Sequence, residues 1–137
     1  MILEYAQLLS TAHHVLDGHN APKGIYKKTH VNHPSTIWAR KSAANYNWLY
    51  CLFTDLCEEY THRYGKKHLT ETKMRDTGLL NLPPWGIAWD VPFTEPPQCM
   101  PDQYKVPNDS IKAYRNYYRD GKAHLLQYTN RNKPEWL

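Results

Sequence analysis

The feature that most constrains this chain is a long helical pattern in the stretch His33–Gly65. Its apolar and aromatic residues recur at spacings of three and four, as on one buried face of a helix; they are Tyr46, Leu49, Tyr50, Phe53, Leu56, Cys57, Tyr60 and Tyr64. Ser42 belongs to the residue types that cap a helix start, and Gly65 to those that end one. A helix of about 20 residues is roughly 30 Å long, so the rest of the chain must pack against it.

Two other segments are predicted to be helices. Met1–Asp17 should end at Gly18, and its apolar side is formed by Ile2, Leu3, Ala6, Leu9, His13 and Leu16. Asn108–Tyr128 should be capped by Asn108 or Asp109, and its apolar side is formed by Ile111, Tyr114, Tyr118, Leu125 and Tyr128. Both predictions rest on the same helical period as the long helix.

Shorter helical turns are expected on either side of the long helix. Ser35–Lys41 should form a turn with Trp38 buried and with Arg40 facing out. Lys66–Thr77 is polar and loosely helical, and a glycine follows it directly.

Leu79–Pro107 is predicted to be irregular, because it holds seven of the chain's ten prolines. Proline removes a backbone donor and fixes φ, which excludes a long helix or a central strand. We expect an ordered segment that folds Trp85 and Trp89 back onto the helices, with a binding loop as the alternative. The expected fold is therefore all-α: one compact domain, residues 1–137, with three main helices and this Pro/Trp-rich excursion.

Composition is compatible with a nucleic-acid-binding protein without requiring one. The formal net charge is +4, and eleven tyrosines and five tryptophans stand against two phenylalanines. Three cysteines without a paired motif indicate a reduced, cytoplasmic protein. No apolar run approaches the roughly 20 residues of a membrane span, and no common catalytic motif is present.

Two basic segments are candidate DNA contacts. In the loop His19–Pro34, Lys27 and Lys28 could bind phosphates while Tyr26 stacks on a base, or the loop could simply be solvated. The pair His30 and His33 lacks further ligands at metal-site spacing, so we expect His33 to cap or pack and no metal to bind.

The second basic segment lies in the last predicted helix. Arg115, Arg119 and Lys122 recur there at spacings of four and three, which suits successive phosphates. An ordinary charged face is the alternative. We add the outward-facing Arg40 to these DNA-binding candidates.

Glu4 lies in the first turn of the first predicted helix. From the residues alone it is a surface carboxylate that the helix dipole favours at this end. No capping residue precedes this helix, and we therefore expect either that a preceding segment is missing or that the start codon lies inside an older gene.

Six motifs carry a resemblance to a known family: MILEYAQLLSTAH, THVNHPSTIWAR, LCEEYTHRYGK, MPDQYK, AYRNYY and KPEWL. Together they resemble small phage proteins of the pyrimidine-dimer DNA glycosylase, or endonuclease V-like, family. The resemblance implies an all-α domain in which an N-terminal α-amine attacks C1′ of a damaged nucleotide. A Schiff base forms, the glycosidic bond breaks, and β-elimination cuts the strand, with no cofactor.

The resemblance assigns roles to four residues of this chain. Glu4 would be the catalytic acid–base glutamate, and Arg115 and Arg119 would hold the phosphodiester backbone. Family members carry a further N-terminal segment that supplies the amine; this chain lacks it, so the candidate nucleophile is the α-amine of Met1. An α-amine has a pKa of about 8, so that a useful fraction is neutral at pH 7.

Three functions follow as hypotheses. The first is a phage glycosylase and abasic-site lyase that acts as a monomer on double-stranded DNA in the host cytoplasm, away from membranes. The second is a catalytically inactive DNA-binding module of the same fold. The third is a phage protein–protein effector that uses the aromatic segment 83–97 to bind a protein partner.

Overall fold

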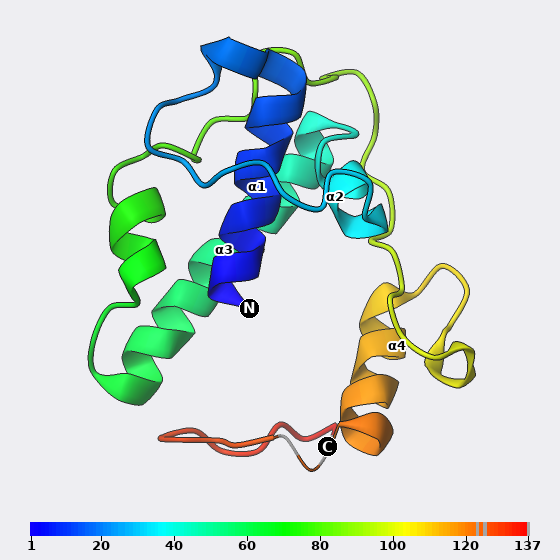
Figure 1. Ribbon diagram of the computed structural model, residues 1–137. Coiled ribbons are helices and arrows are strands. Elements are labelled where there is room, and N and C mark those ends of the chain that lie inside the picture. Colours follow the sequence, from blue (N-terminus) through cyan, green and yellow to red (C-terminus); the bar gives the residue numbers. More distant parts are fainter. Residues whose placement is uncertain (123, 125, 137) are drawn as a thin grey trace. The chain divides into compact units, whose positions relative to one another are not determined.

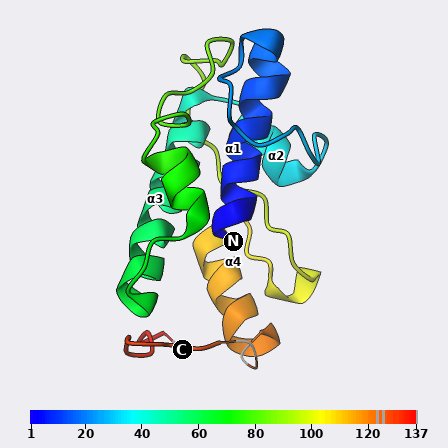
Figure 2. The ribbon, with the colours of Figure 1, turned by 60° about the vertical axis from the view of Figure 1, so that its left-hand side comes forward.

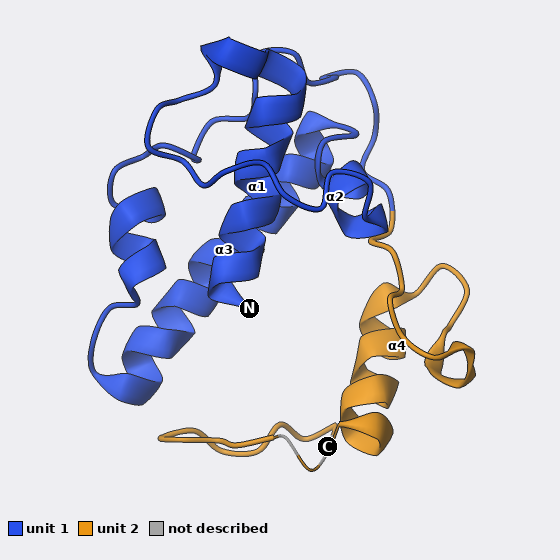
Figure 3. Cartoon of the chain, in the orientation of Figure 1, with its two compact units in different colours: residues 1–94 blue, residues 95–137 orange. Residues whose placement is uncertain are grey.

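The computed structural model describes residues 1–122, 124 and 126–136, and these residues form helices and irregular segments without a strand. The all-α prediction is thereby confirmed. The chain divides into two compact units, residues 1–94 and residues 95–137 (Figure 3). That all 137 residues make a single domain stays a prediction.

Three α-helices build the first unit: α1 (Ile2–Asp17), α2 (Pro34–Ala39) and α3 (Ala43–Tyr64). α1 packs against both α2 and α3 (Figures 1 and 2). A short 3₁₀ segment, η1 (Gly18–Asn20), follows α1, and a π-helical segment, η2 (Glu71–Arg75), packs against α3.

The predicted ends of the two long helices are confirmed. The hydroxyl of Ser42 accepts a hydrogen bond from the backbone N–H of Asn45, which caps α3. Gly65 ends α3 with φ 70°, a left-handed conformation that glycine adopts without a steric penalty. Gly18 ends α1 with φ 55°.

The core of the first unit lies between α1 and α3. Its most completely buried large side chains include Leu9, Tyr46 and Phe53, all 0% exposed. Three predicted members of the apolar faces are instead exposed: Leu3 by 40%, Tyr64 by 52% and, in the second unit, Ile111 by 58%. Leu3 follows the buried Ile2, and one residue along a helix is a rotation of about 100°, which turns Leu3 away from the side of Ile2.

A polar face of α1 holds the loop that follows it. The hydroxyl of Thr11 accepts a hydrogen bond from the N–H of Thr29 and donates one to its carbonyl. Ser10 accepts from the N–H of Tyr26, and His14 Nε2 lies 2.8 Å from the Tyr26 carbonyl. These contacts explain why Ser10 and Thr11 are buried although they are polar.

Trp38 and Asn45 fix the end of the first unit. The Trp38 indole donates to the carbonyl of Thr94, and the Asn45 amide both donates to the Thr94 hydroxyl and accepts from its N–H. Trp38 is 7% exposed, as predicted. It makes edge-to-face contacts with Trp48 and Phe93, at centroid distances of 5.6 and 6.0 Å.

The expectation that Trp85 and Trp89 fold back onto the helices is wrong. Trp85 is 93% exposed and Trp89 67% exposed. The backbone at Trp85 is nevertheless held, because the Asp17 carboxylate accepts hydrogen bonds of 2.9 Å from the N–H groups of Trp85 and Gly86. A Cβ at Gly86 would lie 2.9 Å from the Leu16 carbonyl oxygen, so this approach to α1 requires glycine.

The second unit contains η3 (Asp102–Tyr104), α4 (Ser110–Asn116) and the π-helical segment η4 (Tyr117–Gly121). The Asp109 side chain accepts from the N–H of Lys112, which confirms it as the cap of α4. The predicted single helix Asn108–Tyr128 is wrong at its end, because η4 ends at Gly121 and residues 126–128 are irregular.

The shortening of the last helix has a local cause. A Cβ at Gly121 would lie 2.8 Å from the Tyr117 ring, so the chain turns there on a residue that disfavours helix. Leu126 and Tyr128 lie in irregular backbone. Leu125, assigned to the apolar face of that helix, lies outside the described residues.

Candidate functional site

The first candidate site is the N-terminal end of α1. The α-amine of Met1 lies 2.7 Å from Glu4 Oε2, one helical turn away. The two side chains are 58% and 65% exposed, so this end of α1 is open to solvent. This ammonium–carboxylate contact is the pair that the sequence hypothesis named.

The ammonium of Met1 sets the charge state of Glu4. Its hydrogen bond, together with the backbone N–H of Glu4, holds the pKa of this carboxyl below its usual value. Glu4 is therefore ionised at neutral pH, and its carboxylate holds the adjacent ammonium in place. An ionised carboxylate at this distance also stabilises any cation formed on the same nitrogen.

The basic loop after α1 presents a row of lysines. Lys23, Lys27 and Lys28 are exposed. Tyr26 is only half-exposed, and its hydroxyl lies 3.1 Å from the hydroxyl of Thr70. That Tyr26 stacks on a base stays a prediction, since the ring is already held by the fold.

Arg40 does not point freely into solvent as expected. Its Nη1 donates a 2.7 Å hydrogen bond to the carbonyl of Val31, and the residue is half-buried. The contact ties the loop before α2 to its C-terminal end. DNA binding by Arg40 is still a prediction.

The basic residues of the second unit do not form one α-helical stripe. Arg115 lies in α4 and Arg119 in η4, and both are exposed. Lys122 follows η4 and is half-buried, with its ammonium 5.1 Å from the Tyr117 ring centroid and 5.8 Å from that of Tyr118. Two arginines at a spacing of four thus remain available for phosphates.

Both arginines are oriented by neighbours. The Arg115 guanidinium lies 5.3 Å from the ring centroid of Trp136, a cation–π distance. Arg119 Nη2 donates a 2.8 Å hydrogen bond to the Asn116 side chain. These contacts hold the guanidinium groups at the surface without neutralising their charge.

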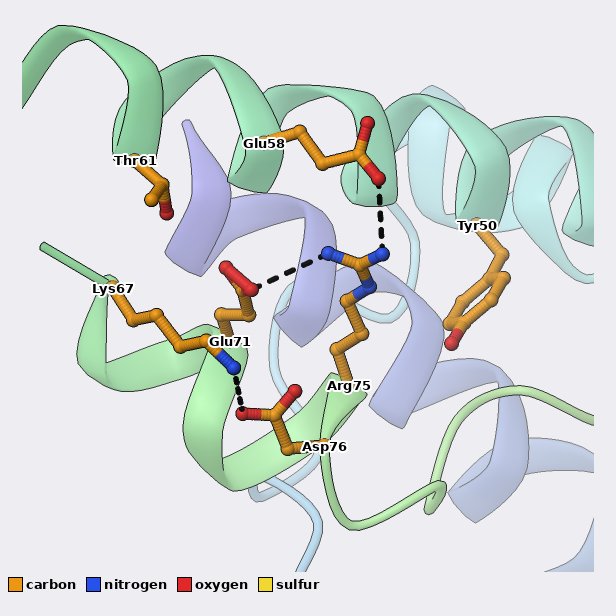
Figure 4. Close-up of a pocket in the computed structure, with 7 residues that line it drawn as sticks. All are labelled: Tyr50, Glu58, Thr61, Lys67, Glu71, Arg75 and Asp76. Carbon is orange, nitrogen blue, oxygen red and sulfur yellow. Dashed lines mark hydrogen bonds and ion pairs between the residues drawn. The ribbon is translucent and has the colours of Figure 1, made fainter. Parts of the chain in front are cut away.

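Sequence reasoning missed a pocket between α3 and the segment 67–76, called the Glu71 pocket below (Figure 4). Its volume is about 500 Å³. Arg75 lies between two glutamates, with Nη2 3.0 Å from Glu58 and Nη1 3.3 Å from Glu71. Lys67 pairs with Asp76 at 3.1 Å.

One sequence signal for this pocket existed. Glu71 and Arg75 have the spacing of an i, i+4 ion pair on a helix, but the sequence of Lys66–Thr77 predicts only a polar and loosely helical segment. No sequence pattern indicated that Glu71 would be only 3% exposed.

His33 caps α2: its Nδ1 accepts a hydrogen bond from the N–H of Ser35, as the sequence suggested. Among the described residues, no group of three or more His, Cys, Asp or Glu side chains could hold a metal ion. The described helices also include none that is long and apolar enough to cross a membrane.

Comparisons with known proteins give no match: no family model, no curated protein and no solved structure matches the chain. The resemblance to the endonuclease V-like family therefore stays a prediction that rests on the quoted motifs.

Proposed function

We propose that the chain is an endonuclease V-like DNA-repair protein, a DNA glycosylase and abasic-site lyase acting on damaged pyrimidines. Its nucleophile is the α-amine of Met1, and its acid–base group is Glu4. The observation that supports this most is the 2.7 Å distance between that amine and Glu4 Oε2 at an exposed helix end. The reaction needs an accessible amine beside a carboxylate.

The first chemical step forms a covalent bond between protein and DNA. The neutral amine attacks C1′ of the damaged nucleotide, the glycosidic bond breaks, and the base leaves with the proton that the amine loses. The C1′–O4′ bond then breaks, which opens the sugar ring, and O4′ takes up a proton. At an abasic site the same amine adds to the C1′ aldehyde and water leaves. Both routes give an iminium ion on the Met1 nitrogen, and ionised Glu4 stabilises its positive charge.

The second step cuts the strand. Loss of a proton from C2′ lets the 3′ phosphate leave by β-elimination, and hydrolysis of the iminium then frees the amine. Glu4 is the group on α1 that can take the proton released by the ammonium at the start and the C2′ proton later. Glu4 is ionised at neutral pH, so it starts the reaction in the form that can accept a proton.

DNA is held by exposed cations that the chain carries in each unit. Lys27 and Lys28 in the first unit, and Arg115 and Arg119 in the second, contact backbone phosphates. The proposed setting is the cytoplasm of a phage-infected host cell, which agrees with three cysteines that form no disulfide.

Cleavage of a duplex that carries one abasic site tests this proposal. Wild type should nick the strand and leave a 3′ unsaturated aldehyde, and Glu4→Gln should slow the nick by about 100-fold or more. Asp55→Asn removes one exposed charge from α3 and is the matched control, with a wild-type rate expected. Equal cleavage by wild type and Glu4→Gln would overturn the role of Glu4.

A catalytically inactive DNA-binding module is the second candidate. It is favoured by Lys23, Lys27 and Lys28, which are exposed in a loop that hydrogen bonds hold against α1. This candidate predicts binding of duplex DNA by wild type with no nick at an abasic site.

A further inference from the structure

Glu71 is a buried carboxylate with too few partners. It is 3% exposed, and its Oε1 has no hydrogen-bond partner among the described residues. Its Oε2 lies 3.3 Å from Arg75 Nη1, longer than the roughly 2.7–2.9 Å of a well-formed charge-assisted hydrogen bond. Arg75 makes its shorter contact, 3.0 Å, with the exposed Glu58.

The negative charge of Glu71 affects the pKa of a neighbouring side chain. Burial raises the pKa of the Cys57 thiol to about 12, and the negative charge of Glu71 is the next largest cause. The pocket as a whole carries a formal charge of −1, because Glu58, Glu71 and Asp76 outnumber Lys67 and Arg75. A buried carboxylate with one oxygen unbonded is energetically costly, and a cationic N–H donor would relieve that cost.

The pocket favours an organic cation over a metal ion. No cluster of three or more metal-ligating side chains occurs among the described residues, so an ion would lack ligands here. The volume of about 500 Å³ lies within the usual range for small-molecule sites. Figure 4 shows Thr61 on the Glu71 side of the pocket and the Tyr50 ring on the other side of Arg75.

We propose that the Glu71 pocket binds a small primary amine, with the ammonium group against the Glu71 carboxylate. Rotation about the last side-chain torsion, which is soft in glutamate, turns the unbonded oxygen toward the ligand. The Thr61 hydroxyl accepts a second N–H, and Arg75 keeps its ion pair with Glu58. The pocket contains no residue of α1, so this site is independent of the proposed lyase activity.

Titration calorimetry of the full chain with n-butylammonium chloride tests the proposal. Tetramethylammonium has the charge but no N–H donor, and 1-butanol has the same four-carbon chain but no charge. The expected result is binding of n-butylammonium at least tenfold tighter than binding of either control compound. Equal binding of all three, or no binding of n-butylammonium, would overturn the proposal.

Variants locate the site. Glu71→Gln keeps the shape of the side chain and should weaken n-butylammonium at least tenfold, whereas Asp55→Asn removes a charge outside the pocket and should leave affinity unchanged. Thr61→Val replaces the hydroxyl with a methyl group and should weaken binding of n-butylammonium severalfold. It tests the site even if Glu71→Gln does not fold. Wild-type affinity in both Glu71→Gln and Thr61→Val would contradict the assignment.

Discussion

The Nε2 atom of His13 lies 2.8 Å from the hydroxyl oxygen of Tyr46. That hydroxyl donates its own proton to the carbonyl of Leu80, at 2.7 Å, so His13 must donate through Nε2. Burial lowers the pKa of His13 and so favours the neutral imidazole, whose single proton then lies on Nε2. This buried relay joins α1, α3 and the segment after η2.

Stability should depend on pH through His13. Burial lowers the pKa of His13 below its usual value near 6.5. As pH falls below about 6.5, the unfolded chain binds a proton that the folded chain does not, so the free energy of unfolding falls. Urea unfolding followed by circular dichroism at pH 5, 6, 7 and 8 measures this loss.

Variants assign the pH effect. His13→Gln keeps an N–H donor but cannot titrate, so its stability should fall less on acidification than that of wild type. His19→Gln alters an exposed histidine and should retain the wild-type pH dependence. An unchanged pH dependence in His13→Gln would show that another group is responsible.

Asp17 should control the order of the exposed tryptophan loop. Asp17→Ala removes the acceptor for the N–H groups of Trp85 and Gly86, each hydrogen bond contributing roughly 1 kcal/mol. Hydrogen exchange at these two amides should become about fivefold faster or more. Asp90→Ala is the control: it changes an exposed residue of the same segment that accepts neither hydrogen bond, so exchange should keep the wild-type rate. Unchanged exchange in Asp17→Ala would show that Asp17 does not hold the loop.

The loop lysines should govern the salt dependence of duplex binding. If both bind phosphates, the double variant Lys27→Ala/Lys28→Ala should reduce the slope of log K against log salt by about 2. Lys66→Ala/Lys73→Ala removes the same charge from exposed positions elsewhere in the first unit. Equal slopes for the two double variants would mean that the loop makes no specific phosphate contacts.

Much of the helical framework could be predicted because its signals are local. The apolar period of α3, the Ser42 cap and the Gly65 stop depend on neighbours in sequence, and all were found in the structure. The end of the last helix was missed although it too has a local signal: Gly121, four residues after Tyr117, is a residue type that disfavours helix.

The candidate sites could be predicted only where their residues lie close together in the sequence. Met1 and Glu4 are one helical turn apart, so a helix prediction alone brings them together. The backbone N–H of Trp85 is held by Asp17, 68 positions earlier in the chain. The burial of Glu71 depends on how the segment 67–76 packs on α3, which composition does not specify.

The most direct test of the central claim is borohydride trapping on a duplex with one abasic site, followed by peptide mapping of the adduct. Borohydride reduces an iminium to a stable amine, so an active lyase becomes covalently linked to the DNA. The account predicts an adduct on the Met1 nitrogen that Glu4→Gln strongly reduces and Asp55→Asn does not. An adduct on a lysine side chain, or tight binding without any adduct, would contradict it.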